Sequence, residues 1–111
     1  MSITARHEGL FEGTVDYTYH ILGCGAIGSS AAMQLARMGA VYFHLYDRDT
    51  VEDVNIGVSQ YIESDINKEK VDALKQHLLK ISRELIVDAH SGDFNEFYFQ
   101  DHNDIVILGF D

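Results

Sequence analysis

The chain has 111 residues, 46% of them hydrophobic, which is enough for one domain with a sizeable core. Its 18 acidic and 8 basic residues give a net charge of −10, which argues against a nucleic-acid-binding surface. One cysteine excludes a disulfide framework or a multi-cysteine zinc site within the chain, and the apolar runs are too short to span a membrane, so we expect a cytoplasmic protein with no membrane partner.

The first half of the chain shows a strand pattern followed by a helix pattern. We expect residues 1–15 to form a polar N-terminal arm and residues 16–111 to form the folded domain. The apolar run Tyr17–Leu22 is typical of a buried central strand. The alanine-rich segment Gly28–Met38 predicts a helix that ends before Gly39, because glycine commonly follows a helix C-terminus.

The rest of the chain continues to alternate between strand and helix patterns. The predicted elements are a strand at Val41–Tyr46, a long loop with room for one helical turn at Thr50–Asn67, a helix at Lys68–Ile81, and strands at Leu85–Ala89 and Ile105–Leu108. The helix prediction depends on apolar residues at three- and four-residue spacing, namely Val71, Leu74, Leu78 and Ile81. The pattern over residues 94–100 is ambiguous.

Buried strands that alternate with helices are typical of a parallel sheet with helices on both faces. We therefore expect a three-layer, Rossmann-like α/β fold with a mainly parallel sheet. Right-handed crossover connections predict the strand order 3-2-1-4, with a ligand crevice at the carboxyl ends of strands 1 and 4. The candidate residues at that edge are Gly23, Gly25, Gly28, Asp47 and Asp111.

A G-x-G-x-x-G motif at Gly23–Gly28 follows the first strand directly. Its glycines let backbone N–H groups approach a phosphate, and the helix N-terminus after them favours negative charge. The candidate phosphate-binding residues are Gly23, Gly25, Ala26, Ile27, Gly28 and Ser29. Asp47, at the end of the second strand, can bind ribose hydroxyls through its two carboxylate oxygens. The alternative interpretation is a tight strand-to-helix turn without a ligand, in which Ser29 caps the helix.

The segment after the second strand carries a more specific signal. The residues Asp47-Arg48-Asp49-Thr50-Val51, followed by Asn55, Gln60, Asp65-Ile66 and Lys70, resemble the adenylating domain of the ThiF/MoeB and ubiquitin-activating enzyme superfamily. The closing residues 104–111 resemble the fourth strand of that family, and residues 6–10 resemble its N-terminal arm. The resemblance spans the whole chain but only the first half of the family's domain. Because the chain also stops at the mouth of a strand, we expect it to be truncated.

The resemblance implies roles for individual residues. Asp49, Asn55 and Gln60 would contact the nucleotide, and Lys70 would bind it and act in catalysis by neutralising charge on the α- and β-phosphates. Asp111 would coordinate Mg²⁺ and so serve as the metal ligand and a second catalytic residue. Asp49 could instead be a solvated loop acid, and Asn55 and Gln60 could be loop amides that satisfy backbone groups. Lys70 could be a solvated helix lysine, and Asp111 could be an exposed chain end.

The chain departs from the family pattern at two places. Val58 or Ser59 stands where the family has an arginine before the glutamine, and Asn67 replaces a glycine. The family arginine would contact nucleotide phosphates, and Arg48 or Arg6 is the residue that could substitute for it. The family's catalytic cysteine and zinc cysteines would lie beyond residue 111. Cys24 lies within the glycine motif and is expected to be a small packed side chain. The six histidines lack metal-ligand spacing, and those in predicted strands, His20 and His44, are expected at the core or at an edge.

The resemblance implies an ATP- and Mg²⁺-dependent enzyme that adenylates a carboxylate, the C-terminal glycine of a ubiquitin-like or sulfur-carrier protein. It also implies a homodimer, because Arg6 of the arm would reach the nucleotide of a partner subunit. Two alternatives stay open. An NAD(P)-binding oxidoreductase domain explains the glycine motif and Asp47, but it leaves Asn55, Gln60 and Lys70 without roles. A non-catalytic nucleotide-binding or dimerisation module accommodates the missing arginine.

Overall fold

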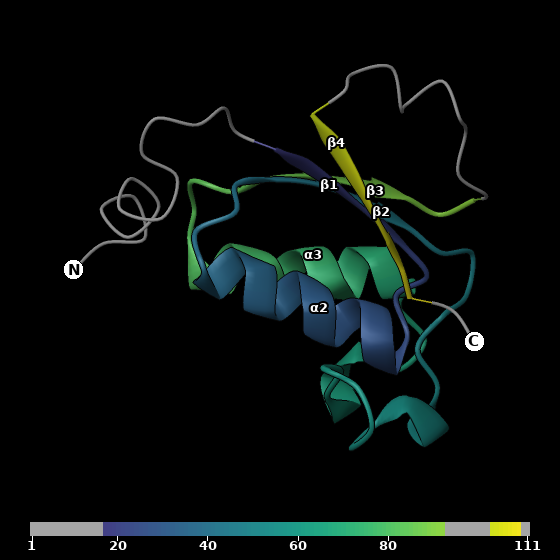
Figure 1. Cartoon of the computed structure of the whole chain (residues 1–111). Helices are drawn as coiled ribbons and strands as arrows, with labels where there is room; N and C mark the ends of the chain where they lie inside the picture. The colour runs from purple at the N-terminus through teal and green to yellow at the C-terminus, as the bar shows by residue number, and fades with distance from the viewer. Residues whose placement is uncertain (1–16, 93–102, 110–111) are drawn as a thin grey trace.

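The computed structural model describes residues 17–92 and 103–109 of the chain. Four parallel strands form one sheet in the order β3-β2-β1-β4, which confirms the predicted order (Figure 1). The strands are β1 (Thr18–Leu22), β2 (Tyr42–Tyr46), β3 (Ile86–His90) and β4 (Asp104–Leu108). The carboxyl ends of β1 and β4 therefore lie side by side, where the strand order reverses.

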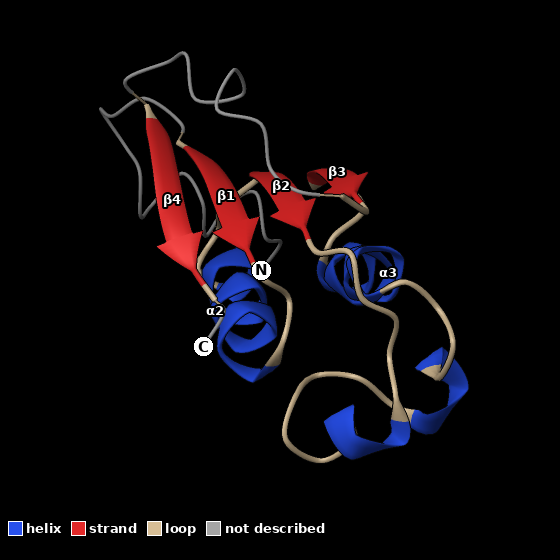
Figure 2. Ribbon diagram, turned by 90° about the vertical axis from the view of Figure 1, so that its right-hand side faces the viewer, coloured by secondary structure: helices blue, strands red, loops and turns tan. Residues whose placement is uncertain are grey.

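Two helices, α2 (Ala26–Arg37) and α3 (Lys70–Ile81), lie together on one face of the sheet (Figures 1 and 2). The helix α2 begins two residues before its predicted start at Gly28, and α3 begins two residues after its predicted start at Lys68. The N–H of Ser29 donates to Gly25, so α2 already begins at Ala26, whereas Lys68 bonds back to Asp65 and delays the start of α3. The described residues supply the sheet and this one helical layer; the layer predicted for the other face is not among them.

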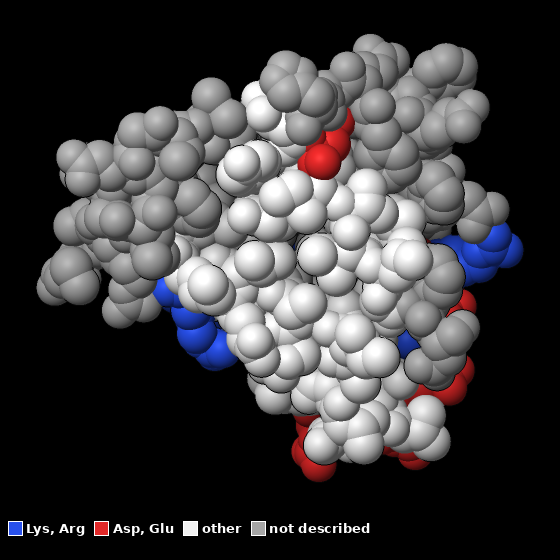
Figure 3. Space-filling view, viewed as in Figure 1, with Lys and Arg blue, Asp and Glu red and all other residues white. Residues whose placement is uncertain are grey.

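The long predicted loop, residues 50–67, is a crossover segment between β2 and α3. It contains two short 3₁₀ turns, Asp53–Asn55 and Glu63–Asp65, where one turn was predicted. Asn67 has a positive φ of 76°, which asparagine tolerates better than most residues and which explains why it can replace glycine there. Figure 3 shows acidic side chains gathered at the end of the molecule where this segment lies.

The hydrophobic core lies between the sheet and the two helices. Phe43 and Leu45 of β2 and Ile21 of β1 are at most 1% exposed, and they pack in one cluster with Leu74 and Leu78 of α3. The helix α2 contributes mainly small side chains to this cluster, which allows its backbone to lie close to the sheet. Among the residues described, no helix has the length and apolar character that a membrane crossing requires.

The opposite face of the sheet carries a polar network instead of an apolar layer. His20 in β1 is completely buried, as expected for a core residue. Its Nδ1 lies 2.9 Å from the hydroxyl of Tyr46, and its Nε2 lies 2.9 Å from Oδ1 of Asp104. With the Nε2–H tautomer, Tyr46 donates to His20 and His20 donates to Asp104. One imidazole thus connects β1 to the neighbouring strands β2 and β4.

Two further histidines continue this network across β2 and β3. Nδ1 of His44 lies 2.9 Å from Nε2 of His90, and the His44 ring stacks on that of His20 with centroids 4.9 Å apart. Burial, reinforced by the nearby His20, lowers the pKa of His44, and burial likewise lowers the pKa of His90. Asp88 acts in the opposite direction on both pKa values. The pair is therefore held in its neutral form in the folded protein.

This network predicts an acid-sensitive fold. The pKa values of His44 and His90 are lower than the value of about 6.5 expected in the unfolded chain, so the unfolded chain binds more protons just below that pH. The free energy of unfolding should therefore fall as the pH drops through about 6.5, as measured by urea unfolding. Replacing both residues by phenylalanine should flatten this dependence while keeping the stacked rings. An unchanged pH slope in that double variant would contradict the explanation.

Candidate functional site

The glycine motif turns the chain sharply from the end of β1 into α2. Gly23 has a positive φ of 95°, a conformation that favours glycine, and its N–H donates to the carbonyl of Tyr46 over 2.8 Å. Gly25 precedes the first residue of α2, and no side chain caps the helix there. The N–H groups of the first turn, at Ala26 and Ile27, therefore lack the intrahelical partners that later residues have.

Glycines also set how closely three segments approach one another. A Cβ atom on Gly28 would overlap the carbonyl group of Gly23, and a Cβ atom on Gly109 would overlap both of these residues. The N–H of Gly109 donates to the carbonyl of Leu22 over 2.7 Å, which fixes the end of β4 against the end of β1. Gly109 was not among the predicted site residues. The signal was a glycine directly after the last apolar strand, at the edge where the first motif ends.

A cavity of about 230 Å³ opens at this junction. Its lining residues are Gly23, Gly25, Ala26, Ile27, Asp47, Asp49, Lys70 and Gly109. Seven of these eight were predicted from the sequence, and they come from the glycine motif, the end of β2 and the start of α3. The fold therefore brings Lys70 at the start of α3 next to the glycine motif, although the two are far apart in the sequence.

Asp47 does more in the structure than line this cavity. Its Oδ2 accepts the N–H of Cys24 over 2.8 Å, and its Oδ1 accepts the N–H of Asp49 over 2.9 Å. Both carboxylate oxygens thus bond to the backbone, and one of them ties the glycine motif to the end of β2. Each oxygen keeps a further lone pair for a ligand. The sequence predicted the ligand role but not this structural one.

A second cavity, of about 370 Å³, adjoins the first and shares Asp49 and Lys70 with it. It is also lined by Arg48, Thr50, Glu52 and Asn55. Lys70 is held at this boundary because its N–H donates to the carbonyl of Asp49 over 2.9 Å, next to an antiparallel bridge between Thr50 and Glu69. Arg48 is one of the two arginines that the sequence offered as a substitute for the missing family arginine, and it does line this cavity, whereas Thr50 and Glu52 were not predicted for the site.

The charges around the two cavities are mixed. Their described lining contains three carboxylates, Asp47, Asp49 and Glu52, and two cations, Arg48 and Lys70. Among the described residues there is no group of three or more His, Cys, Asp or Glu side chains placed to hold a metal ion. Mg²⁺ commonly takes only one or two carboxylate ligands from a protein and further oxygens from water and nucleotide phosphates.

The remaining predicted site residues lie elsewhere. Ser29 is fully buried and its Oγ accepts the N–H of Gln60 over 3.4 Å, so this pair joins α2 to the crossover segment and lines neither cavity. Asn55 lines the second cavity, and its Oδ1 accepts the N–H of Glu52. Gly28 acts through close packing. Asp111 and Arg6 lie outside the described residues.

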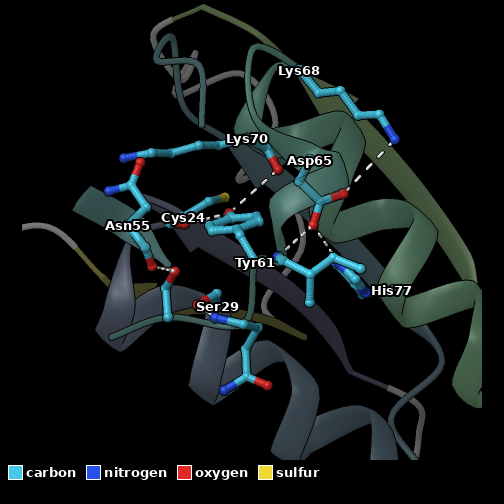
Figure 4. Close-up of polar contacts among 11 residues, drawn as sticks. Cys24, Ser29, Asn55, Tyr61, Asp65, Lys68, Lys70 and His77 are labelled. Carbon is cyan, nitrogen blue, oxygen red and sulfur yellow. Dashed lines mark hydrogen bonds and ion pairs between the residues drawn. The ribbon is translucent and has the colours of Figure 1, made fainter. Parts of the chain in front are cut away.

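The buried carboxylate of Asp65 holds the crossover segment against α3, as Figure 4 shows. Oδ2 of Asp65 accepts the N–H of Ile62 over 2.9 Å and lies 2.7 Å from Nε2 of His77. Burial by itself would raise the pKa of Asp65, but these hydrogen bonds and the charge of Lys68 outweigh it and lower that pKa. The structure confirms that Cys24 is a packed side chain: it is completely buried, and burial raises the pKa of its thiol to about 12.

The chain is similar to several known proteins. A family model described as the ThiF family matches residues 8–111. Ubiquitin-like modifier-activating enzyme 5 of Oryza sativa subsp. japonica is 35% identical over 81 residues, and tRNA threonylcarbamoyladenosine dehydratase of Bacillus subtilis is 36% identical over 83 residues. The crystal structure of E. coli MccB with ATP superposes with a TM-score of 0.76 and 27% identity.

These matches cover most of this chain but only part of each relative. They span 73%, 74% and 93% of the chain, against 19%, 32% and 30% of the three relatives in the same order. The chain therefore spans about a third or less of the length of these relatives, and the comparisons show a shared family and fold over the matched part.

The packing of the glycines makes a direct prediction. Gly28→Ala should lower the free energy of unfolding by about 1–3 kcal/mol or more, because the new methyl group overlaps the backbone of Gly23. Gly25→Ala is the matched control: a Cβ there has no atom within 4 Å, and the effect on stability should stay within about 0.5 kcal/mol. Urea unfolding of the two variants measures both values. Equal stability would show that the junction can relax and does not depend on Gly28.

Proposed function

This chain belongs to the ThiF family, and on that premise we propose that it binds ATP with Mg²⁺ for the adenylation of a carboxylate. The observation that carries the proposal is the pair of adjoining cavities. One has the open N-terminus of α2 on its wall, and both share the side chains of Asp49 and Lys70. The two cavities together would offer N–H groups for an anion, two cationic side chains and carboxylate oxygens that suit a metal ion.

The phosphates would lie between α2 and Lys70. The free N–H groups at Ala26 and Ile27 and the positive end of the helix favour phosphate oxygens. Lys70 reaches the same cavity from α3 and would neutralise charge on the α- and β-phosphates. Asp47 would accept the ribose hydroxyls with the lone pairs that its backbone bonds leave available. The crystallised ATP complex of MccB, a protein similar in fold, supports this choice of nucleotide.

Magnesium fits the charge balance of the site. The three carboxylates would repel a bare triphosphate, and Asp49, at the boundary of the two cavities, would hold a Mg²⁺ ion that offsets the charge of the phosphates. We also propose Asp111 as a metal ligand, by its place in the family pattern. Because the family arginine before Gln60 is missing, Arg48 in the second cavity is the described residue best placed to supply a further positive charge to the phosphates.

The reaction proposed for the site is attack of a carboxylate oxygen on the α-phosphorus. The bond between the α-phosphorus and the bridging oxygen breaks, pyrophosphate leaves, and an acyl-adenylate forms. The chain contributes by positioning and by neutralising charge. We propose a ubiquitin-like or sulfur-carrier protein as the source of the carboxylate, because one relative is named as a ubiquitin-like modifier-activating enzyme. We also propose a cytoplasmic homodimer in which Arg6 reaches the partner subunit's nucleotide.

Ligand preference tests the proposal. ATP with Mg²⁺ should raise the melting temperature of the protein more than NAD does, because ligands that bind the folded state stabilise it by mass action.

Lys70→Met should weaken ATP binding by roughly 10- to 100-fold in calorimetric titrations, as expected when a charged hydrogen bond is lost. Lys80→Met, in the exposed last turn of α3, is the matched control and should bind ATP unchanged.

Each other result favours a different function. An equal or larger effect of NAD would support an NAD(P)-binding oxidoreductase domain instead. The absence of stabilisation by any nucleotide would support a dimerisation module.

A further inference from the structure

Tyr61 connects the two halves of the proposed site through its hydroxyl group. The residue lies in the crossover segment and is only 2% exposed. Its hydroxyl donates to the carbonyl of Cys24 in the glycine motif and lies 3.3 Å from the carbonyl of Lys70 at the start of α3 (Figure 4). A phenol has one proton, and the contact to Cys24 is the shorter of the two, so Cys24 is its main acceptor.

We propose that the hydroxyl of Tyr61 is a positioning group that holds the glycine motif in the conformation needed to bind phosphate. The inference rests on the proposed nucleotide-binding function and extends it to a residue that does not line either cavity.

The contacts of Cys24 explain why one hydroxyl can matter. Asp47 accepts the N–H of Cys24, and Tyr61 donates to its carbonyl oxygen, so the peptide groups on both sides of this residue are held from two different segments. The next residues, Gly25 and Ala26, lead into the first turn of α2 and line the first cavity. Gly25 has no side chain that could restrict its backbone, so the direction of the following N–H groups depends on how firmly Cys24 is held.

The chemical state of Tyr61 suits this task. Burial raises its pKa well above the ordinary tyrosine value, and the nearby Cys24 and Asp47 act in the same direction. The hydroxyl therefore stays protonated, and remains a hydrogen-bond donor, at neutral pH. The second contact places the same hydroxyl beside Lys70, the residue proposed to meet the phosphates from the opposite wall.

The hydroxyl and the ring of Tyr61 can be separated by experiment. The ring packs in the hydrophobic core, and phenylalanine would fill the same space. Tyr61→Phe therefore removes the hydrogen bond to Cys24 and leaves the packing intact. Tyr19→Phe is the matched control, because Tyr19 is another largely buried tyrosine, 7% exposed, whose ring packs on Phe43 in the core away from both cavities.

The first measurement needs no nucleotide. Amide hydrogen exchange of Cys24 should become about 3- to 10-fold faster in Tyr61→Phe, the change expected for one lost hydrogen bond. Exchange at the buried strand residues Ile21 and Leu45 reports the stability of the whole fold and should change less. Equal acceleration at all three amides, or none at Cys24, would overturn the proposal, since the hydroxyl would then act on the fold as a whole or not at all.

The second measurement uses ATP with Mg²⁺ and calorimetric titration. Tyr61→Phe should weaken binding by about 3- to 10-fold, whereas Tyr19→Phe should leave it unchanged. Unchanged affinity in Tyr61→Phe would overturn the positioning role even if nucleotide binding is confirmed. If the unmodified protein binds no ATP, the proposed function fails, and the exchange rates at Cys24 still decide whether Tyr61 holds the glycine motif.

Discussion

The close contact of three backbone segments at Gly23, Gly28 and Gly109 is the constraint on which the rest of the structure depends. A single methyl group at Gly28 or Gly109 would overlap the backbone of its neighbours. Because these three glycines have no side chains, the first turn of α2 can lie directly against the ends of β1 and β4. Because that turn carries N–H groups without intrahelical partners, the same contact that closes the fold also places these groups at the point where the strand order reverses.

The groups around the site serve the fold and the proposed ligand together. Asp47 holds the glycine motif with both carboxylate oxygens, and the backbone of Asp49 holds the start of α3 beside it. Such hydrogen bonds fix the direction of the site before any ligand binds, which reduces the ordering that binding would otherwise require. The crossover segment completes this arrangement through Tyr61 and through the buried contact of Asp65 with His77.

The two faces of the sheet are stabilised by different interactions. The face under α2 and α3 is an ordinary apolar core, whereas the other face carries His20, His44 and His90 in a stacked, hydrogen-bonded row. The alternation within β1 already separates Tyr19 and Ile21 from His20, so the sequence shows two different faces. It does not show that His20 bonds to Asp104, because these residues lie in strands that pair only after the sheet has formed.

Local patterns in the sequence were sufficient for the strands, both helices, the strand order and most of the first cavity. Period, glycine placement and the handedness of crossovers are properties of short segments or general rules, so they can be read without knowing distant neighbours. Helix starts were misplaced by two residues because hydrogen bonds of Gly25 and Asp65 set them. Only the tertiary structure placed Gly109 at the first cavity, joined Tyr61 to the glycine motif and showed that Asp47 accepts backbone hydrogen bonds. Those roles depend on contacts between segments far apart in the chain, and no local pattern specifies which distant group will be the partner.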